Sequence, residues 1–243
     1  MPSIISDIER LKKELRAIIL AHNYQHPDVQ DIADYVGDSL GLAQTAARTD
    51  AKVIVFCGVH FMAETAAILC PDKIVLMPDP QAGCPMANMI TVRELRELKK
   101  QYPDAVVVTY VNSSAAIKAE SDYCCTSSNA VQVVTSIPKE KRIIFIPDQH
   151  LGHYVKTQTH RDNMILWRGY CPTHRRILAE DIRKKKQLYP DALVVVHPEC
   201  TTDVVSMADQ VASTSGILKY CKESTSNAFI IGTSLTIGFM LVF

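Results

Sequence analysis

The sequence contains no Cys-X-X-Cys pair, although it has eight cysteines. This absence excludes the usual signatures of zinc ribbons, thioredoxins and ferredoxins. Any metal site must therefore be assembled from distant segments of the chain. Eight thiols would suit disulfides in a secreted protein, whereas in a cytoplasmic one they indicate buried thiols or metal ligands.

Neither sign of charge is in excess, because Lys plus Arg and Asp plus Glu both number 26. Such a balance gives no field that would attract nucleic acid or an anionic membrane, so we expect small molecules as partners. Residues 1–16 predict an amphipathic helix that lacks the apolar stretch and cleavage site of a signal peptide, and the expected location is cytoplasmic. The apolar residues on one side of this helix are Ile5, Ile8, Leu11 and Leu15.

Apolar, β-branched runs recur along the chain with helical patterns between them. This alternation is typical of βαβ units around buried parallel strands, so the expected class is α/β. The 243 residues, 47% of them hydrophobic, are enough to bury a sizeable core. The expected strands begin near residues 17, 52, 73, 105, 142, 164, 192 and 228.

An internal repeat of 87 residues organises the chain, because "YPDAVVV" begins at Tyr102 and "YPDALVVV" at Tyr189. The Cys-Pro pairs at Cys84 and Cys171 share that spacing, and a first copy begins at Ala17. Repeats of this length predict three small three-layer α/β domains with pseudo-threefold symmetry rather than a solenoid. The expected divisions are a helix at 1–16 and repeat domains at 17–101, 102–188 and 189–243.

The third copy is expected to be incomplete, because its Cys-Pro loop would fall near position 258 and the sequence ends at 243. The run "AFIIGT" predicts a strand, but "SLTIGFMLVF" lacks the polar face of the helix that should follow it. Truncation or an altered reading frame is the favoured explanation, with a natural short variant as the alternative.

Polar residues stand where the first strand of each copy ends. Ligands of open α/β sheets gather outside the carboxyl ends of strands, so the three sets are expected to converge on one central cavity. Either His22 or His197 alone is more simply a structural residue with satisfied hydrogen bonds, but the threefold recurrence favours a site. The sets are His22, Asn23 and Tyr24, then Tyr110 and Asn112, then His197 and Glu199.

Hydroxyl residues recur near the expected helix starts. Free backbone N–H groups at helix N-termini suit phosphate or carboxylate, although each hydroxyl alone is more often a plain N-cap. As a set they indicate an anionic substrate. They are Ser39, Ser127, Ser128, Ser213, Thr214 and Ser215.

The Cys-Pro loops place Cys84 and Cys171 in irregular backbone, because proline removes a donor and restricts the residue before it. Symmetry would bring these thiols together on one axis, and a third copy would add a third sulfur. Three thiolates could bind three irons of a 4Fe-4S cluster and leave the fourth iron open as a Lewis acid. Cys57 and Cys70, by contrast, are expected to be buried, inert thiols.

Eight motifs occur in order between about residue 15 and about residue 233: "AHNYQ" (21–25), "GDSLGLA" (37–43), "FCGVHFMAETA" (56–66), "PDPQAGCPMA" (78–87), "YVNSSAAIKAESD" (110–122), "IPDQHLG" (146–152), "WRGYCPTH" (167–174) and "HPEC" (197–200). Together they closely resemble the quinolinate synthase family of NAD biosynthesis. One mild departure is His150, where family members usually have Asn.

The resemblance implies three domains in a triangle around a central active site, with an oxygen-sensitive 4Fe-4S cluster on one cysteine from each domain. It also implies that iminoaspartate, supplied by aspartate oxidase, condenses with dihydroxyacetone phosphate, losing phosphate and two waters to give quinolinate. Cys84 and Cys171 would be two of the cluster ligands. The third would lie near position 258, so we expect the chain as written to be cluster-poor or cluster-free unless Cys124, Cys125, Cys200 or an outside ligand substitutes.

Ten residues are carried over by motif as the lining of the substrate cavity. The resemblance implies that serines hold phosphate, that Tyr110 and Glu199 move protons, and that histidines and Asn112 orient carboxylates and oxyanions. The substrate-binding set is His22, Ser39, Tyr110, Asn112, Ser127, His197, Glu199 and Thr214. The catalytic set is His22, Tyr24, Tyr110, His174, His197 and Glu199.

A non-catalytic α/β protein that binds phosphorylated ligands and keeps its cysteines for structure is the alternative. The repeat-spaced Cys84 and Cys171 favour the enzyme, whereas the incomplete third copy favours binding without turnover. Quinolinate formation separates the two hypotheses.

Overall fold

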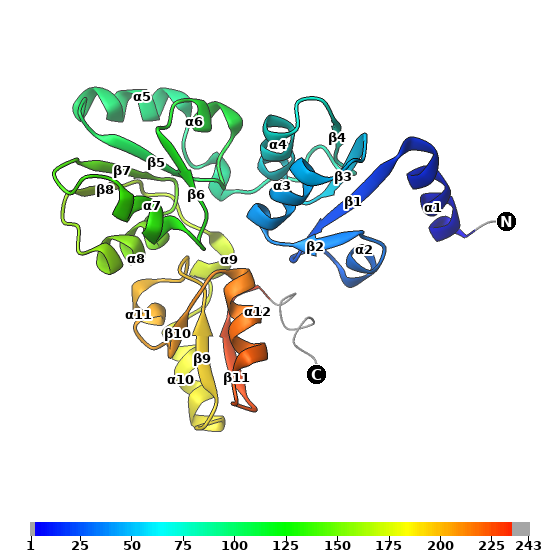
Figure 1. The fold of residues 1–243 in the computed structure, drawn as a ribbon. Coiled ribbons are helices and arrows are strands. Elements are labelled where there is room, and N and C mark those ends of the chain that lie inside the picture. The colour runs from blue at the N-terminus through cyan, green and yellow to red at the C-terminus, as the bar shows by residue number, and fades with distance from the viewer. Residues whose placement is uncertain (1–2, 235–243) are drawn as a thin grey trace. The chain divides into compact units, whose positions relative to one another are not determined.

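The computed structural model describes residues 3–234, whose strands form three separate parallel sheets (Figure 1). The chain divides into two compact units, residues 1–84 with one sheet and residues 85–243 with two. The predicted α/β class and the parallel pairing of the strands are confirmed. The predicted divisions after residues 16, 101 and 188 stay predictions.

The first unit holds a four-stranded sheet in the order β2-β1-β3-β4. Its central strands β1 and β3 are largely buried, and Leu20, Ile54 and Phe56 on them are fully enclosed. Its elements are α1 (Ile4–Leu15), β1 (Ala17–His22), α2 (Pro27–Asp31), β2 (Tyr35–Gly37), α3 (Ser39–Arg48), β3 (Val53–Cys57), α4 (His60–Leu69) and β4 (Ile74–Leu76).

Helix α1 matches the helix predicted at 1–16, and Ser3 caps its N-terminus. Its Ile8 packs against buried residues of β1 and β3, but Ile5, Leu11 and Leu15 on the predicted apolar side remain exposed. Leu11 and Leu15 instead line a cavity of about 620 Å³ beside the sheet. The predicted apolar side of this helix is therefore only partly covered within the first unit.

The second unit begins with a four-stranded sheet in the order β6-β5-β7-β8. Every residue of β7 is buried, as a central parallel strand requires. The elements are η1 (Met86–Asn88), α5 (Val92–Gln101), β5 (Val106–Tyr110), α6 (Ala115–Ala119), β6 (Tyr123–Cys125), α7 (Ala130–Ser136), β7 (Ile143–Ile146), α8 (Gln149–Thr159) and β8 (Met164–Leu166).

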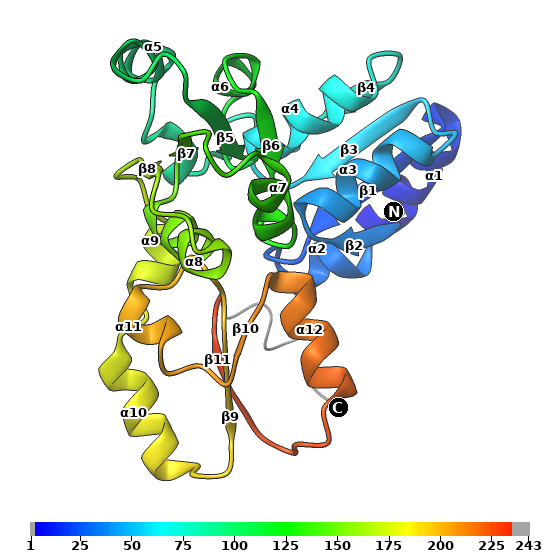
Figure 2. The same ribbon diagram turned by 60° about the vertical axis from the view of Figure 1, so that its left-hand side comes forward.

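The rest of the second unit is a three-stranded sheet in the order β10-β9-β11. Two views show α10 and α12 on opposite sides of this sheet (Figures 1 and 2). Its elements are α9 (Pro172–Arg175), α10 (Ala179–Leu188), β9 (Leu193–Val196), α11 (Thr202–Val205), β10 (Gln210–Val211), α12 (Thr214–Glu223) and β11 (Phe229–Gly232).

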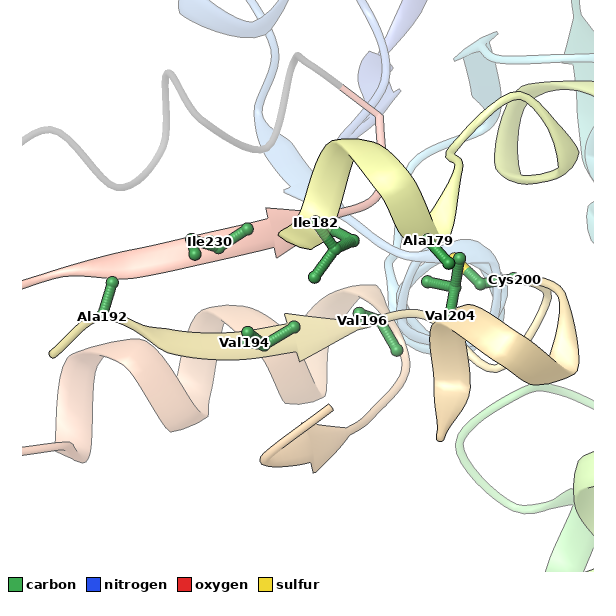
Figure 3. Close-up of a cluster of buried hydrophobic side chains, with 8 residues drawn as sticks. All are labelled: Ala179, Ile182, Ala192, Val194, Val196, Cys200, Val204 and Ile230. Carbon is green, nitrogen blue, oxygen red and sulfur yellow. The ribbon is translucent and has the colours of Figure 1, made fainter. Parts of the chain in front are cut away.

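Alternating side chains of β9 form the two apolar layers of this sheet. Val194 and Val196 pack with Ile182 of α10 (Figure 3), whereas Val195 packs with Ile217 of α12. Successive side chains of a strand point to opposite faces, so one short apolar run fills two cores. The continuous valine run of β9 is thus explained by helices on both faces.

Three short strands, β2, β6 and β10, were not predicted. They contain only two or three residues each and lie at the edges of their sheets. The edge strands β4 and β8 were predicted because they lie in the apolar runs "KIVLM" and "MILW", whereas β2, β6 and β10 lie in no such run. The run at 228 forms β11 as predicted. The segment "SLTIGFMLVF", in which no amphipathic helix is expected, lies outside the described residues except for Ser234.

The repeat is visible as the same carboxylate contact in all three sheets. An aspartate before each edge strand accepts a hydrogen bond from a backbone N–H of the central strand. The pairs are Asp34 with Ile19 at 2.7 Å, Asp122 with Val107 at 2.8 Å and Asp209 with Val194 at 2.7 Å. The three aspartates follow the repeat spacing, so the period inferred from "YPDA" and Cys-Pro extends to a specific hydrogen bond.

None of the helices described between residues 3 and 234 is both long and apolar enough to cross a bilayer.

The repeated contact predicts a stability effect. Replacing Asp209 by Ala is expected to lower the free energy of unfolding by about 1 to 2 kcal/mol, because the Val194 amide loses a charged acceptor. Asp191→Ala is the matched control, since Asp191 is exposed in the turn before β9 and should change stability by less than about 0.5 kcal/mol. Denaturant unfolding followed by circular dichroism measures both, and equal effects would contradict the assignment.

Candidate functional site

The carboxyl ends of strands from both sheets of the second unit meet around one buried carboxylate, that of Glu199. Glu199 follows β9, and its Oε2 lies 2.7 Å from Nδ1 of His174 in α9. The two side chains are 4% and 2% exposed. Tyr110, the last residue of β5, donates a side-chain hydrogen bond to the same carboxylate.

These contacts keep Glu199 ionised in spite of its burial. Burial acts to raise its pKa, but His197, His174 and the hydrogen bonds from His174 and Tyr110 outweigh it and hold the pKa below its ordinary value. A carboxylate with hydrogen-bonding partners on several sides can accept a proton only when those partners move or change. The site therefore holds a positioned base next to a phenolic proton donor.

His174 is oriented through both ring nitrogens. Its Nδ1 faces Glu199 and also lies 3.1 Å from Sγ of Cys171, while its Nε2 lies 3.0 Å from Oγ1 of Thr233 after β11. The ring stacks on His197 with 4.6 Å between centroids. The imidazole is thus fixed between a carboxylate, a thiol and a hydroxyl.

His197 is held as a neutral imidazole. Its Nδ1 accepts the N–H of Glu199 at 3.2 Å, so its proton lies on Nε2, 3.2 Å from Oγ of Ser127. Burial lowers its pKa to about 4. The structure therefore brings Ser127, predicted from a helix start, to a histidine predicted from a strand end.

Asp148 anchors the loop that carries Cys171. One carboxylate oxygen accepts the N–H groups of His150 and Leu151 at 2.8 Å each, and the other accepts the N–H of Cys171 at 3.0 Å. Asp148 is fully buried, and its pKa is raised by that burial and by the charge of Glu199. Sequence reasoning missed this residue, although an Asp before α8 is a recognisable N-cap.

Gly169 lets the same loop approach β7. A Cβ at this position would lie 2.3 Å from the carbonyl oxygen of Pro147, closer than any side chain tolerates. The carbonyl of Gly169 accepts the N–H of Gln149 at 2.8 Å. The glycine in "WRGYCPTH" therefore serves the close packing that places Cys171 beside Asp148.

Asn112 and Thr214 complete the predicted set in the second unit. The buried Oδ1 of Asn112 finds no hydrogen-bond partner among residues 3–234, which leaves an acceptor that a ligand could satisfy. Thr214 is buried at the first position of α12, where Ser213 caps the helix by accepting the N–H of Gly216 at 3.3 Å.

The first unit contains the remaining predicted residues. His22 is buried at the end of β1, its Nδ1 accepts the N–H of Tyr24 at 3.2 Å, and the two rings meet edge to face. Ser39 opens α3 after the N-cap Asp38. Cys84 is half-buried at the last residue of the unit. Convergence of these residues with those of the second unit stays a prediction.

The eight cysteines form no disulfides and differ in exposure. Five are buried, Cys57 and Cys70 among them as predicted, and Cys124 is exposed. Cys84 and Cys171 are partly accessible, and Sγ of Cys171 accepts backbone hydrogen bonds from the first turn of α9. Accessible sulfurs that accept backbone N–H groups fit the requirements of a thiolate-bound iron–sulfur cluster. Burial raises the pKa of the Cys171 thiol, with Glu199 adding to the effect.

Comparisons with known proteins identify what the chain resembles. The family model described as Quinolinate synthetase A protein matches residues 6–241. Quinolinate synthase of Desulforudis audaxviator is 56% identical over 230 residues, covering 95% of this chain and 76% of that protein. The Methanosarcina barkeri protein is 56% identical over 95% of this chain and 75% of its own length, and that of Geobacter sp. strain M21 is 58% identical over 94% and 74%.

One solved structure, of the E-1-hydroxy-2-methyl-but-2-enyl-4-diphosphate reductase from Plasmodium falciparum, aligns with a TM-score of 0.29 and 11% identity over 95% of this chain and 87% of that one. Values this low support no statement about fold or function.

The anchoring of the Cys171 loop yields a prediction. Asp148→Ala is expected to lower the free energy of unfolding by about 2 to 4 kcal/mol, because buried amides lose their acceptor, and to speed alkylation of Cys171. Asp148→Asn should change both the free energy of unfolding and the alkylation rate less, because one carbonyl oxygen remains as an acceptor. Asp162→Ala, at an exposed position, is the control. Thermal unfolding and mass mapping of iodoacetamide-labelled peptides measure the two effects. An unchanged alkylation rate in Asp148→Ala would contradict the anchoring role.

The burial of His197 predicts a pH dependence of stability. Its folded pKa of about 4 lies below the ordinary value of about 6.5, so the unfolded chain binds more protons between these pH values. Stability is then complete above about pH 6.5 and is lost as the pH falls towards 4, by about 3 kcal/mol at most. Denaturant unfolding of the metal-free protein should show a smaller loss for His197→Gln. Parallel plots of the free energy of unfolding against pH for the wild type and His197→Gln would contradict this role of His197.

Proposed function

Because this chain belongs to the quinolinate synthase family, we propose that it condenses iminoaspartate with dihydroxyacetone phosphate to form quinolinate, releasing phosphate and water. The buried hydrogen-bonded group of Tyr110, Glu199 and His174 is the observation that supports this most directly. Isomerisation and dehydration both require proton transfer at carbon and oxygen, and this group offers an acid and a base within reach of one another.

Tyr110 and Glu199 are the proposed proton-transfer pair. The ionised Glu199 accepts the phenolic hydrogen bond, so a proton removed from substrate can pass to the carboxylate while Tyr110 stabilises the developing charge. His174 orients the carboxylate through Nδ1, and Thr233 fixes the ring from the other side. Tyr110, Glu199 and His174 are buried, which strengthens these interactions by excluding water.

The anionic parts of the substrates are proposed to bind at hydroxyls and amide groups. Neutral His197 directs its Nε2 proton towards Ser127, and both can donate to a phosphate or carboxylate oxygen. Asn112 contributes its amide beside the end of β5. In the first unit, Ser39 opens the ten-residue helix α3, where Asp38 accepts the N–H of Gly41 at 2.8 Å, so the Ser39 hydroxyl is the proposed donor to an anion. Thr214, His22 and Tyr24 are assigned to substrate contacts on the family motifs alone.

Cys84 and Cys171 are proposed as two ligands of a 4Fe-4S cluster. The partly accessible thiols and the backbone donors around Cys171 support the assignment. When bound, such a cluster supplies an open iron that acts as a Lewis acid on an oxygen of the substrate. Asp148 would hold the Cys171 backbone in place.

A functional link to aspartate oxidase is also proposed, because iminoaspartate must be supplied by oxidation of aspartate. The link concerns the supply of substrate and requires no binding surface between the two proteins. For a non-catalytic phosphate-binding protein, residues 3–234 add no observation beyond the incomplete third copy of the repeat.

The proposed proton-transfer pair predicts selective loss of activity. Glu199→Gln and Tyr110→Phe, prepared without oxygen, are expected to lower quinolinate formation by about 10² to 10⁴-fold, because general acid–base catalysis is removed. Iron and sulfide content should remain at the wild-type level. Quinolinate is measured by chromatography after mixing with iminoaspartate and dihydroxyacetone phosphate.

Cysteine variants test the cluster assignment separately. Cys84→Ser and Cys171→Ser should lose the iron and the activity that the anaerobically reconstituted wild type has, whereas Cys124→Ser, altering an exposed thiol, should retain both. Wild-type rates in Glu199→Gln would contradict the proton-transfer roles, and wild-type iron in Cys171→Ser would contradict the cluster assignment.

A further inference from the structure

We infer that Lys118 and Ser113 are positioning residues that hold the phenol of Tyr110 in its hydrogen bond with the buried carboxylate. Neither residue is among the site residues predicted from the sequence. Both lie just beyond β5: Ser113 is in the turn that follows the strand, and Lys118 is in α6. The inference rests on the proton-transfer roles proposed above, because the position of Tyr110 affects turnover only if its phenol takes part in the reaction.

Ser113 fastens the turn after β5 through two donors. Its backbone N–H donates to the carbonyl of Val111 at 2.8 Å, and its hydroxyl donates to the carbonyl of Tyr110 at 3.1 Å. The peptide group that joins Tyr110 to Val111 is also held from its other side, because its N–H donates to the carbonyl of Cys125 in β6 at 2.9 Å. Ser113 is fully buried, and burial strengthens such hydrogen bonds.

Lys118 secures the same turn from α6. Its Nζ donates to the carbonyl of Ser113 at 2.6 Å, five residues back along the chain. Lys118 is half-buried, and a charged donor makes a shorter and stronger hydrogen bond than a neutral one does. Ser114 caps α6 by accepting the N–H of Ile117 at 3.3 Å, so the helix that carries Lys118 begins directly after the carbonyl that its ammonium holds.

The turn carries two of the proposed site residues. Tyr110 stands at its start and donates to the carboxylate of Glu199. Asn112 is the central residue of the three-residue turn that the N–H of Ser113 closes. The buried Oδ1 of Asn112 has no hydrogen-bond partner in the described part of the chain, so this oxygen takes no part in holding the turn. A displaced turn would therefore move the phenol donor and the unpartnered oxygen together.

Positioning of this kind is expected to affect turnover more than substrate binding. A proton passes between Tyr110 and its partners only over a hydrogen-bond distance, so a shift of about 1 Å slows the step about 10²-fold. The proposed contacts to the anionic parts of the substrates also come from other segments, Ser127 and His197 among them. Loss of Lys118 or Ser113 should therefore lower kcat and change KM less.

Steady-state kinetics of quinolinate formation provide the first test, with the anaerobically reconstituted chain. Lys118→Met keeps the apolar stem and removes the charged donor, whereas Ser113→Ala removes the hydroxyl. Each is expected to lower kcat about 10 to 100-fold and to change KM for either substrate by less than about threefold, at wild-type iron content. An unchanged kcat in both variants, or a loss that appears in KM alone, overturns the proposal.

Lys99→Met and Ser136→Ala are the matched controls, because they remove the same kinds of contact elsewhere in the second unit. Nζ of Lys99 donates to the carbonyl of Glu120 at 2.8 Å, and the hydroxyl of Ser136 donates to the carbonyl of Val133 at 2.7 Å. Both variants should keep the wild-type kcat even where the midpoint of denaturant unfolding falls. If they lose as much kcat as Lys118→Met does, the effect is one of stability and the positioning role is wrong.

A fluorine label reads the contact without turnover. The metal-free chain is prepared with 3-fluorotyrosine, and the ¹⁹F NMR signal of Tyr110 is identified by its absence from Tyr110→Phe. Glu199→Gln should shift this signal because the acceptor changes. Lys118→Met and Ser113→Ala should shift or broaden it, whereas Lys99→Met should leave it in place. A signal that neither Lys118→Met nor Ser113→Ala alters overturns the proposal.

The two measurements separate the positioning role from the proposed function. A wild-type chain that forms no quinolinate contradicts the proposed function, and the fluorine signal then still decides whether Lys118 and Ser113 hold Tyr110. Quinolinate formation by the wild type, together with an unaltered fluorine signal in both variants, contradicts the positioning role alone.

Discussion

The burial of the Glu199 carboxylate is the constraint around which the site is built. A charged group removed from water is costly unless partners replace its hydration. Here the partners come from separate segments: Tyr110 ends a strand of one sheet, whereas His174 and His197 belong to segments before and after the first strand of the next. The hydrogen-bond partners of the Glu199 carboxylate therefore come from both sheets of the second unit.

Asp148 imposes a second constraint of the same kind. Its carboxylate accepts backbone amides from α8 and from Cys171, so it joins the helix start to the Cys-Pro loop. Gly169 permits that approach because no side chain would fit against Pro147. The sulfur of Cys171 is consequently held 3.1 Å from Nδ1 of His174.

The aspartates before the edge strands show how a repeated fold can carry different chemistry. Asp34, Asp122 and Asp209 make the same contact with a central strand in each sheet. The strand ends carry histidine in the first and third sheets and tyrosine in the second. The same internal hydrogen bond thus recurs in each sheet while the strand ends are not all the same functional group.

The sequence by itself determined the α/β class, the 87-residue period, the central strands and the family, because these depend on apolar periodicity and on motifs of contiguous residues. It also identified Tyr110, Ser127, His174, His197 and Glu199. Only the tertiary structure decided that Asp148 binds the Cys171 amide and that Thr233 faces His174. It alone also showed the edge strands β2, β6 and β10. These contacts join segments up to 59 residues apart, and they arise from the packing of strands, which local patterns do not encode.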